Sequence, residues 1–80
     1  NHFEIQQLSN KIIINNLESN LNSATIQIIG RVGTILFNKN YNPIPDTITI
    51  DLKDILYNGN GIYFVKINSK SNSLVKKFIY

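Results

Sequence analysis

Residues 61–80, GIYFVKINSKSNSLVKKFIY, are the stretch that decides the fold. Two runs rich in β-branched and aromatic residues, 61–67 and 74–80, flank a turn built from Asn, Ser and Lys at residues 68–73. This pattern is typical of a β-hairpin. The sequence therefore predicts that the chain ends inside a strand, although terminal residues are commonly frayed unless a sheet holds them. We expect this end to serve either as core or as a feature that another protein recognises.

The length and composition predict one small all-β domain that spans residues 1–80. Eighty residues leave no room for a second core, and stability should be about 5 kcal/mol. Ile and Asn dominate, while Cys, Met and Trp are absent. Abundant Ile, with Val, Thr, Tyr and Phe, favours strands, and Asn favours turns.

The net charge of +3 does not indicate a nucleic-acid binder. Most lysines lie in the second half of the chain, but Arg31 is the single arginine, and recognition of nucleic acid would favour arginines interleaved with aromatics. We expect the lysines to keep strand faces and sheet edges soluble. Without Cys there is no disulfide or thiolate metal site, and no apolar run is long enough for a membrane span.

The rest of the chain predicts short strands joined by short connections. Alternation should put Ile12 and Ile14 on one face and Ile13 on the other. It should bury Ile26 with Ile28, the apolar positions of 47–52, and Tyr63, Val65 and Ile67 in the final hairpin. The predicted strands are 3–5, 11–15, 24–29, 34–39, 47–52, 61–67 and 74–80. About seven antiparallel strands with no long helix predict a small immunoglobulin-like β-sandwich.

The connections have their own signatures. Residues 6–10 and 16–23 are polar and predict loops, and in 30–33 we expect both Gly30 and Gly33 to need a positive φ. Pro43 and Pro45 exclude a central strand at 40–46, which we interpret as a crossover between sheets. Residues 51–57 allow one helical turn that starts near Asp51 or Lys53 and stops at Asn58 and Gly59.

The side chains present do not indicate an enzyme or a cofactor site. His2 is the only histidine and lies at the start of the chain, and no general acid/base pair is visible. Asp51 and Asp54 are too few for calcium, and we expect them to cap a turn. The Gly-x-x-Gly of 30–33 lacks the helix and the Lys-Ser/Thr pair of a phosphate loop.

The sequence is also compatible with two further functions. Small β-sandwiches can bind glycans through exposed aromatics, for which Tyr41, Tyr57 and Tyr80 are the candidates, although tyrosines near strand ends more often cover the core edge. A carbohydrate-binding or adhesive module of a multidomain secreted protein is therefore the main alternative. The other is an inert module that stabilises a neighbouring catalytic domain.

The order of segments resembles the type A C-terminal sorting domain of the type IX secretion system of Bacteroidetes. The similar segments are 26–36 (IQIIGRVGTIL), 48–52 (ITIDL), 61–67 (GIYFVKI) and 76–80 (KKFIY). The most specific part is the Gly-x-Tyr strand followed, after a turn, by Lys-Lys and an apolar end.

The resemblance implies a non-catalytic signal that directs a cargo protein across the outer membrane to the cell surface or the medium. A sortase-like peptidase usually removes such a domain, and the cargo is then attached to the surface or released. Its partners would be type IX translocon and shuttle components, that peptidase, and an N-terminal cargo domain in cis. Because the chain starts at Asn1 without an initiator Met or a signal peptide, we expect it to be part of a larger secreted protein.

The resemblance also implies which residues are recognised. Gly33 matches the turn glycine between the middle strands, and Gly61 and Tyr63 match the Gly-x-Tyr motif. The terminal signal comprises Lys76, Lys77, Phe78, Ile79 and Tyr80. A terminal strand can be recognised by strand addition, in which backbone hydrogen bonds give affinity and alternate side chains give specificity. Our hypothesis is that this end docks on a translocon component.

Overall fold

Two antiparallel sheets, packed face to face, form the domain. The computed structural model describes residues 3–17, 22–56, 59–70 and 73–80. Its elements are β1 (Phe3–Leu8), β2 (Lys11–Asn16), β3 (Ala24–Gly30), β4 (Ile35–Tyr41), β5 (Thr47–Asp51), the 3-10 helix η1 (Leu52–Asp54), β6 (Ile62–Ser69) and β7 (Ser73–Ile79). The predicted all-β, immunoglobulin-like sandwich is confirmed.

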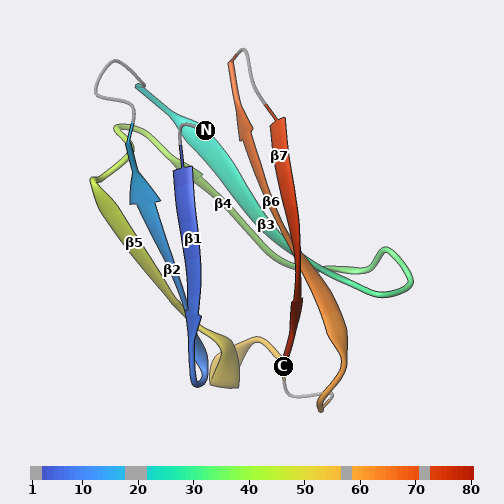
Figure 1. The fold of residues 1–80 in the computed structure, drawn as a ribbon. Coiled ribbons are helices and arrows are strands. Elements are labelled where there is room, and N and C mark those ends of the chain that lie inside the picture. Colours follow the sequence, from blue (N-terminus) through green and yellow to red (C-terminus); the bar gives the residue numbers. More distant parts are fainter. Residues whose placement is uncertain (1–2, 18–21, 57–58, 71–72) are drawn as a thin grey trace.

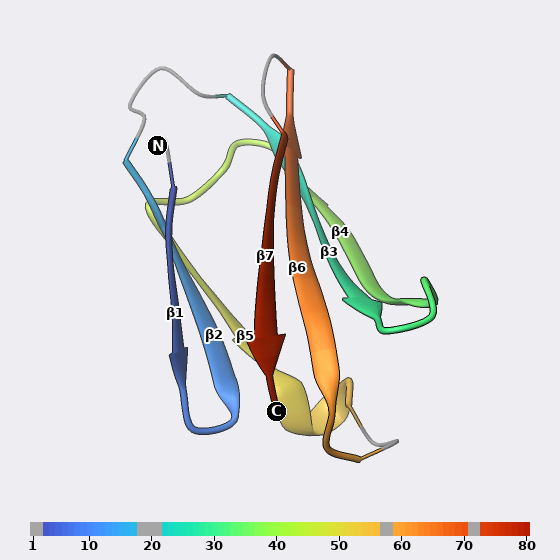
Figure 2. The same cartoon turned by 45° about the vertical axis from the view of Figure 1, so that its right-hand side comes forward.

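The strand order makes the first and the last strand of the chain edge strands of different sheets. The three-stranded sheet has the order β1-β2-β5 and the four-stranded sheet the order β4-β3-β6-β7. Figures 1 and 2 show the two sheets as separate layers. The outermost strands are thus β1 and β5 in one layer and β4 and β7 in the other.

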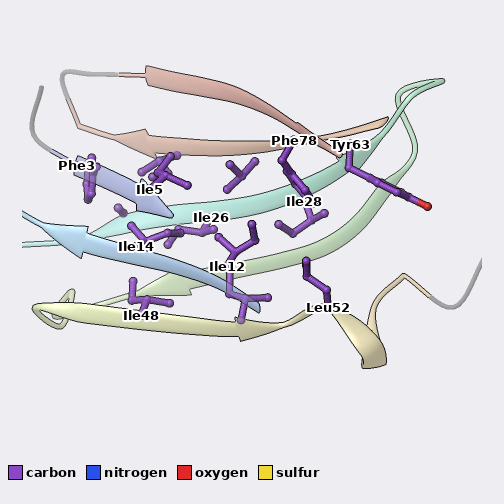
Figure 3. Close-up of a cluster of buried hydrophobic side chains, with 14 of the residues drawn as sticks. Phe3, Ile5, Ile12, Ile14, Ile26, Ile28, Ile48, Leu52, Tyr63 and Phe78 are labelled. Atoms are coloured by element: carbon purple, nitrogen blue, oxygen red, sulfur yellow. The ribbon is translucent and has the colours of Figure 1, made fainter. Parts of the chain in front are cut away.

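Strand alternation fills the space between the layers with apolar side chains. Ile12, Ile14, Ile26 and Ile28 are fully buried, and each contributes about 1.5–3 kcal/mol through burial. Figure 3 shows them pointing into the core from both sheets. The buried set also contains Phe3, Ile5, Ala24, Ile44, Ile48, Ile50, Leu52, Leu56, Tyr63, Val65, Ile67 and Phe78. The predicted inward positions are confirmed in every strand for which alternation was used.

The first hairpin is longer than its sequence indicates. Residues 6–8, predicted as loop, extend β1 and pair with residues 11–13, which leaves a two-residue turn at Ser9 and Asn10. Ser9 adopts a positive φ of 56°. The prediction was wrong because polar side chains are compatible with a strand whose outer face meets water. In the same way, Asn16 belongs to β2, and residues 18–21 of the predicted 16–23 loop lie outside the described residues.

The turn between β3 and β4 uses only one of its two glycines for a special backbone conformation. Gly33 has a φ of +93°, whereas Gly30 is the buried last residue of β3 with no positive φ. The expectation for Gly30 was therefore wrong. Gly30 instead bonds across the turn, its N–H donating to the carbonyl oxygen of Thr34 at 2.8 Å.

The connections on either side of β5 agree with prediction, except that residues 40 and 41 of the predicted crossover belong to β4. Pro43 and Pro45 lie between β4 and β5, where the chain passes from the four-stranded to the three-stranded sheet. Asp51 caps η1, because its carboxylate accepts a bond of 3.0 Å from the N–H of Lys53. Asn58, part of the predicted stop, lies outside the described residues, and Gly59 has a φ of +102°. Among the described residues, no helix has the length and hydropathy to cross a membrane.

Candidate recognition surface on the last hairpin

The register of β6 and β7 divides the predicted recognition residues between two faces. Tyr63 lies opposite Phe78, and Val65 lies opposite Lys76, on the face that packs on the core. Phe64 lies opposite Lys77, and Ile62 opposite Ile79, on the outer face. Directly opposed residues of an antiparallel pair share a face, so the two lysines point in opposite directions.

Tyr63 and Phe78 are core residues. They are 8% and 7% exposed, and their rings stack with centroids 5.9 Å apart. The hydroxyl of Tyr63 donates to the carbonyl oxygen of Gly59 at 2.7 Å. Figure 3 shows both rings in the layer between the sheets. Neither ring is available to a partner while the domain is folded.

Lys76 connects the two sheets. Its Nζ donates to the carbonyl oxygen of Ile5 on β1 at 3.0 Å. A second bond nearby runs from Nε2 of Gln7 to the carbonyl oxygen of Ile79 at 2.7 Å. These contacts hold β1 beside β7, so β1 partly covers the edge of β7 that does not pair with β6.

Lys77 and Ile79 are the exposed predicted residues of the outer face of β7, whereas Lys76 is exposed at the edge of the inward face, where it binds β1. Tyr80 is half-buried and exchanges two backbone bonds of 3.0 Å with Gly61. The predicted site is therefore contiguous along β7, but only part of it faces solvent.

The glycines near the predicted site differ in whether the backbone needs a positive φ at their positions. Gly33 and Gly59 adopt positive φ, whereas Gly61 does not. A Cβ at Gly61 would lie 3.9 Å from Cε2 of Tyr63, which is an ordinary contact. Sterics in this fold therefore require glycine at 59 more than at 61.

Sequence reasoning missed a line of apolar side chains across the outer face of the four-stranded sheet. Ile35, Ile29 and Phe64 lie directly opposite one another across β4, β3 and β6. The available signal was the pairs of adjacent apolar residues, Ile28 with Ile29 and Tyr63 with Phe64, since a strand with one solvated face would alternate.

The charges are also segregated between the sheets. Residues 24–41 and 62–79, which contain the four-stranded sheet and its hairpin turns, carry six positive charges and no Asp or Glu. The positive residues are Arg31, Lys39, Lys66, Lys70, Lys76 and Lys77. All five acidic residues of the chain belong to the remaining segments.

The tyrosines proposed for glycan binding do not form one platform. Tyr41 ends β4 and Tyr80 follows β7, at opposite edges of the four-stranded sheet. Tyr41 is half-buried, the Lys39 ammonium lies 4.9 Å from its ring centroid, and burial raises the pKa of its hydroxyl. Tyr57 and His2 lie outside the described residues. Within the described ranges, no three His, Asp or Glu side chains cluster as metal ligands would.

Comparison with known proteins supports both the fold and the family. A solved structure of a DUF3244 family protein from Bacteroides vulgatus, described as an immunoglobulin-like β-sandwich, superposes with a TM-score of 0.83. It is 17% identical, over 99% of this chain and 83% of that one, and so supports the fold alone. A search of curated proteins finds no match.

The family model described as "secretion system C-terminal sorting domain" matches residues 8–80. Signals of this family serve the type IX system, which delivers proteins across the outer membrane to the cell surface or the medium. With nearly its whole length matched, the chain belongs to the C-terminal sorting domains of the type IX secretion system.

Proposed function

We propose that residues 1–80 form a single non-catalytic domain that directs an N-terminal cargo protein in cis through the type IX system. The family match over residues 8–80 carries this proposal. Translocon and shuttle components recognise the last hairpin. A sortase-like peptidase then removes the domain, and the cargo is attached to the surface or released.

The hairpin offers a partner the outer face of β7. Lys77 and Ile79 are exposed there, while Tyr63 and Phe78 hold β7 on the core from the other side. Gly61, Tyr63, Phe78 and Tyr80 support recognition by fixing this strand rather than by touching the partner. Lys76 contributes by binding β1.

Strand addition at β7 would require β1 to move. Gly61 and Tyr80 exchange both backbone bonds, and bonded pairs alternate along an antiparallel ladder. The backbone groups of Val75, Lys77 and Ile79 therefore point away from β6. Because Gln7 already donates to the Ile79 carbonyl, a partner strand would compete with that bond.

A reporter fusion tests the proposal. Residues 1–80 would follow a signal peptide and a fluorescent protein in a Bacteroidetes host, with and without a functional type IX system. We expect fluorescence on the surface or in the medium only when the system functions. Periplasmic retention in both hosts would contradict the proposal and favour a binding or structural module.

A second comparison separates recognition from folding. Deleting residues 76–80 should block export, but it also removes the core residue Phe78. The double variant Lys77→Ser and Ile79→Ser keeps the core and should block export as well. Its purified domain should melt within a few degrees of the unchanged one, because both side chains are exposed.

A further inference from the structure

The outer face of the four-stranded sheet carries an apolar surface continuous across its strands. In one line, Ile35, Ile29 and Phe64 lie opposite one another, and Lys77 ends the line on β7. In the neighbouring line, Ile62 lies opposite Ile79. We use the name apolar row for the residues of both lines together: Ile29, Ile35, Ile62, Phe64 and Ile79.

Much of this surface is open to solvent. Ile35 is 54% exposed, Ile62 38% and Ile79 67%, although each has a large apolar side chain. A hollow of about 340 Å³ adjoins it at Ile62 and is also lined by Arg31 and Val32. Contiguous exposed apolar residues with a polar border are typical of protein-interaction sites.

The outer face of the other sheet differs. Glu4, Asn15 and Thr47 lie in register across β1, β2 and β5. Asn15 donates to Glu4 and Thr47 donates to Asn15, both at 3.1 Å. This sheet presents a hydrogen-bonded polar row where the four-stranded sheet presents Ile and Phe. On this outer face the apolar side chains are the exposed Leu8 and the partly buried Ile13, and they do not join the polar row.

The charge around the apolar row selects a partner. Lys77 lies opposite Phe64, and Lys66 lies opposite Val75, so both lysines are on the outer face of the four-stranded sheet. Arg31 lies in the turn beside it and lines the adjoining hollow. No Asp or Glu occurs anywhere in this sheet or its hairpin turns. A binding surface on the partner would gain affinity and association rate from acidic side chains around an apolar centre.

We propose that the apolar row, with Lys66, Lys77 and Arg31 at its border, is the docking surface for an acidic-rimmed, apolar protein surface. The inference rests on the proposed function, since it assigns that surface to an outer-membrane component of the type IX system. It extends recognition from the outer face of β7 to the outer face of the whole four-stranded sheet.

Two other occupants fit the surface less well. Anionic membranes attract clusters of roughly four to eight basic residues, but Lys39 and Lys76 lie on the inward face, opposite Ile26 and Val65. A second copy of the domain could supply acidic residues only from outside its four-stranded sheet. The polar row on its three-stranded sheet offers no apolar match to Phe64 and its neighbours.

Binding of the purified 80-residue domain to purified outer-membrane shuttle and translocon subunits of the type IX system tests this inference. Ile35→Ser, far from β7, and Lys77→Glu should each weaken binding to one subunit by about tenfold. Lys53→Glu is the matched control, because it gives the same net charge but lies in η1. It should change affinity less than about twofold, and higher salt should weaken binding of the unchanged domain.

Several results would overturn the inference. These are equal losses from Lys77→Glu and Lys53→Glu, unchanged binding of Ile35→Ser, or no binding to any subunit. Stronger binding to phosphatidylglycerol vesicles than to the subunits would assign the surface to lipid, and dimerisation that Ile35→Ser abolishes would assign it to a second copy. Type IX-dependent export of the unchanged fusion would in each case leave the proposed function standing.

Discussion

The ammonium of Lys76, on the last strand, donates to the carbonyl oxygen of Ile5, on the first, across a distance of 3.0 Å. This bond joins the edge strands of the two sheets. Lys76 lies opposite the fully buried Val65, so a charged side chain occupies an inward position at the border of the core. Inward-pointing charges on edge strands also hinder pairing with other chains.

Replacing Lys76 by Met should destabilise the domain by about 1 kcal/mol. Met retains much of the aliphatic chain but leaves the Ile5 carbonyl without this donor. Urea unfolding of the purified domain measures the change. Lys77→Met is the control, and as an exposed outer-face substitution it should shift stability by less than about 0.5 kcal/mol. Equal losses of unfolding free energy in the two variants would show that the bond from Lys76 to β1 does not stabilise the domain.

The Tyr63 and Phe78 pair should behave as core. Phe78→Ala should cost about 3 kcal/mol, which is most of the stability expected of so small a domain. Tyr63→Phe should cost about 1 kcal/mol, because it leaves the Gly59 carbonyl without the hydroxyl. Thermal unfolding followed by circular dichroism checks both values. A fully stable Phe78→Ala domain would contradict the assignment of Phe78 to the core.

Substitutions at Gly59 and Gly61 distinguish a glycine that the backbone conformation requires from one that a partner could recognise. Gly59→Ala should cost about 1–2 kcal/mol, because φ of +102° is unfavourable for a residue with a Cβ. Gly61→Ala should change stability little, since its Cβ would make an ordinary contact with Tyr63. If translocon components read Gly61 directly, Gly61→Ala should reduce export of the reporter fusion without lowering the melting temperature. Unchanged export would limit Gly61 to a structural role.

Local patterns in the sequence predicted the strands and their buried faces because alternation is a property of each segment alone. Ile12, Ile26 and Ile48 illustrate this, since each lies where period-2 spacing puts it. The same alternation puts the adjacent residues Lys76 and Lys77 on opposite faces of β7. Which distant segments lie side by side cannot be predicted from one segment. The contacts of Lys76 with Ile5 and of Gln7 with Ile79 join the first and last strands, so they were not predicted. The apolar row likewise emerges only when β4, β3 and β6 align.

Backbone conformation was predictable only where a turn is short and tight. Gly33 needs its positive φ because the chain reverses there, whereas Gly30 was already committed to pairing with Tyr63. A Gly-x-x-Gly sequence does not reveal which glycine takes the strained position. The extension of β1 through Gln6 and Gln7 was missed for a related reason, since Gln6 on the solvated face and the exposed Gln7 on the inward face leave no hydrophobic signal.

Loosening β1 from β7 distinguishes the two ways in which the last strand can be recognised. The variant Gln7→Ala with Lys76→Met removes the side-chain bonds that Gln7 and Lys76 make between these strands. Because β7 then loses this support from β1, hydrogen exchange of the Leu74, Lys76 and Phe78 amides, which face β6, should become faster by about tenfold, while amides of β3 keep their protection. Exchange measured by NMR on the purified domain checks this, with Gln6→Ala as the control on the outer face of β1. If a partner adds a strand at β7, the loosened edge should bind it more tightly. If the partner docks on the apolar row, its affinity should stay the same, because neither Gln7 nor Lys76 lies on that face.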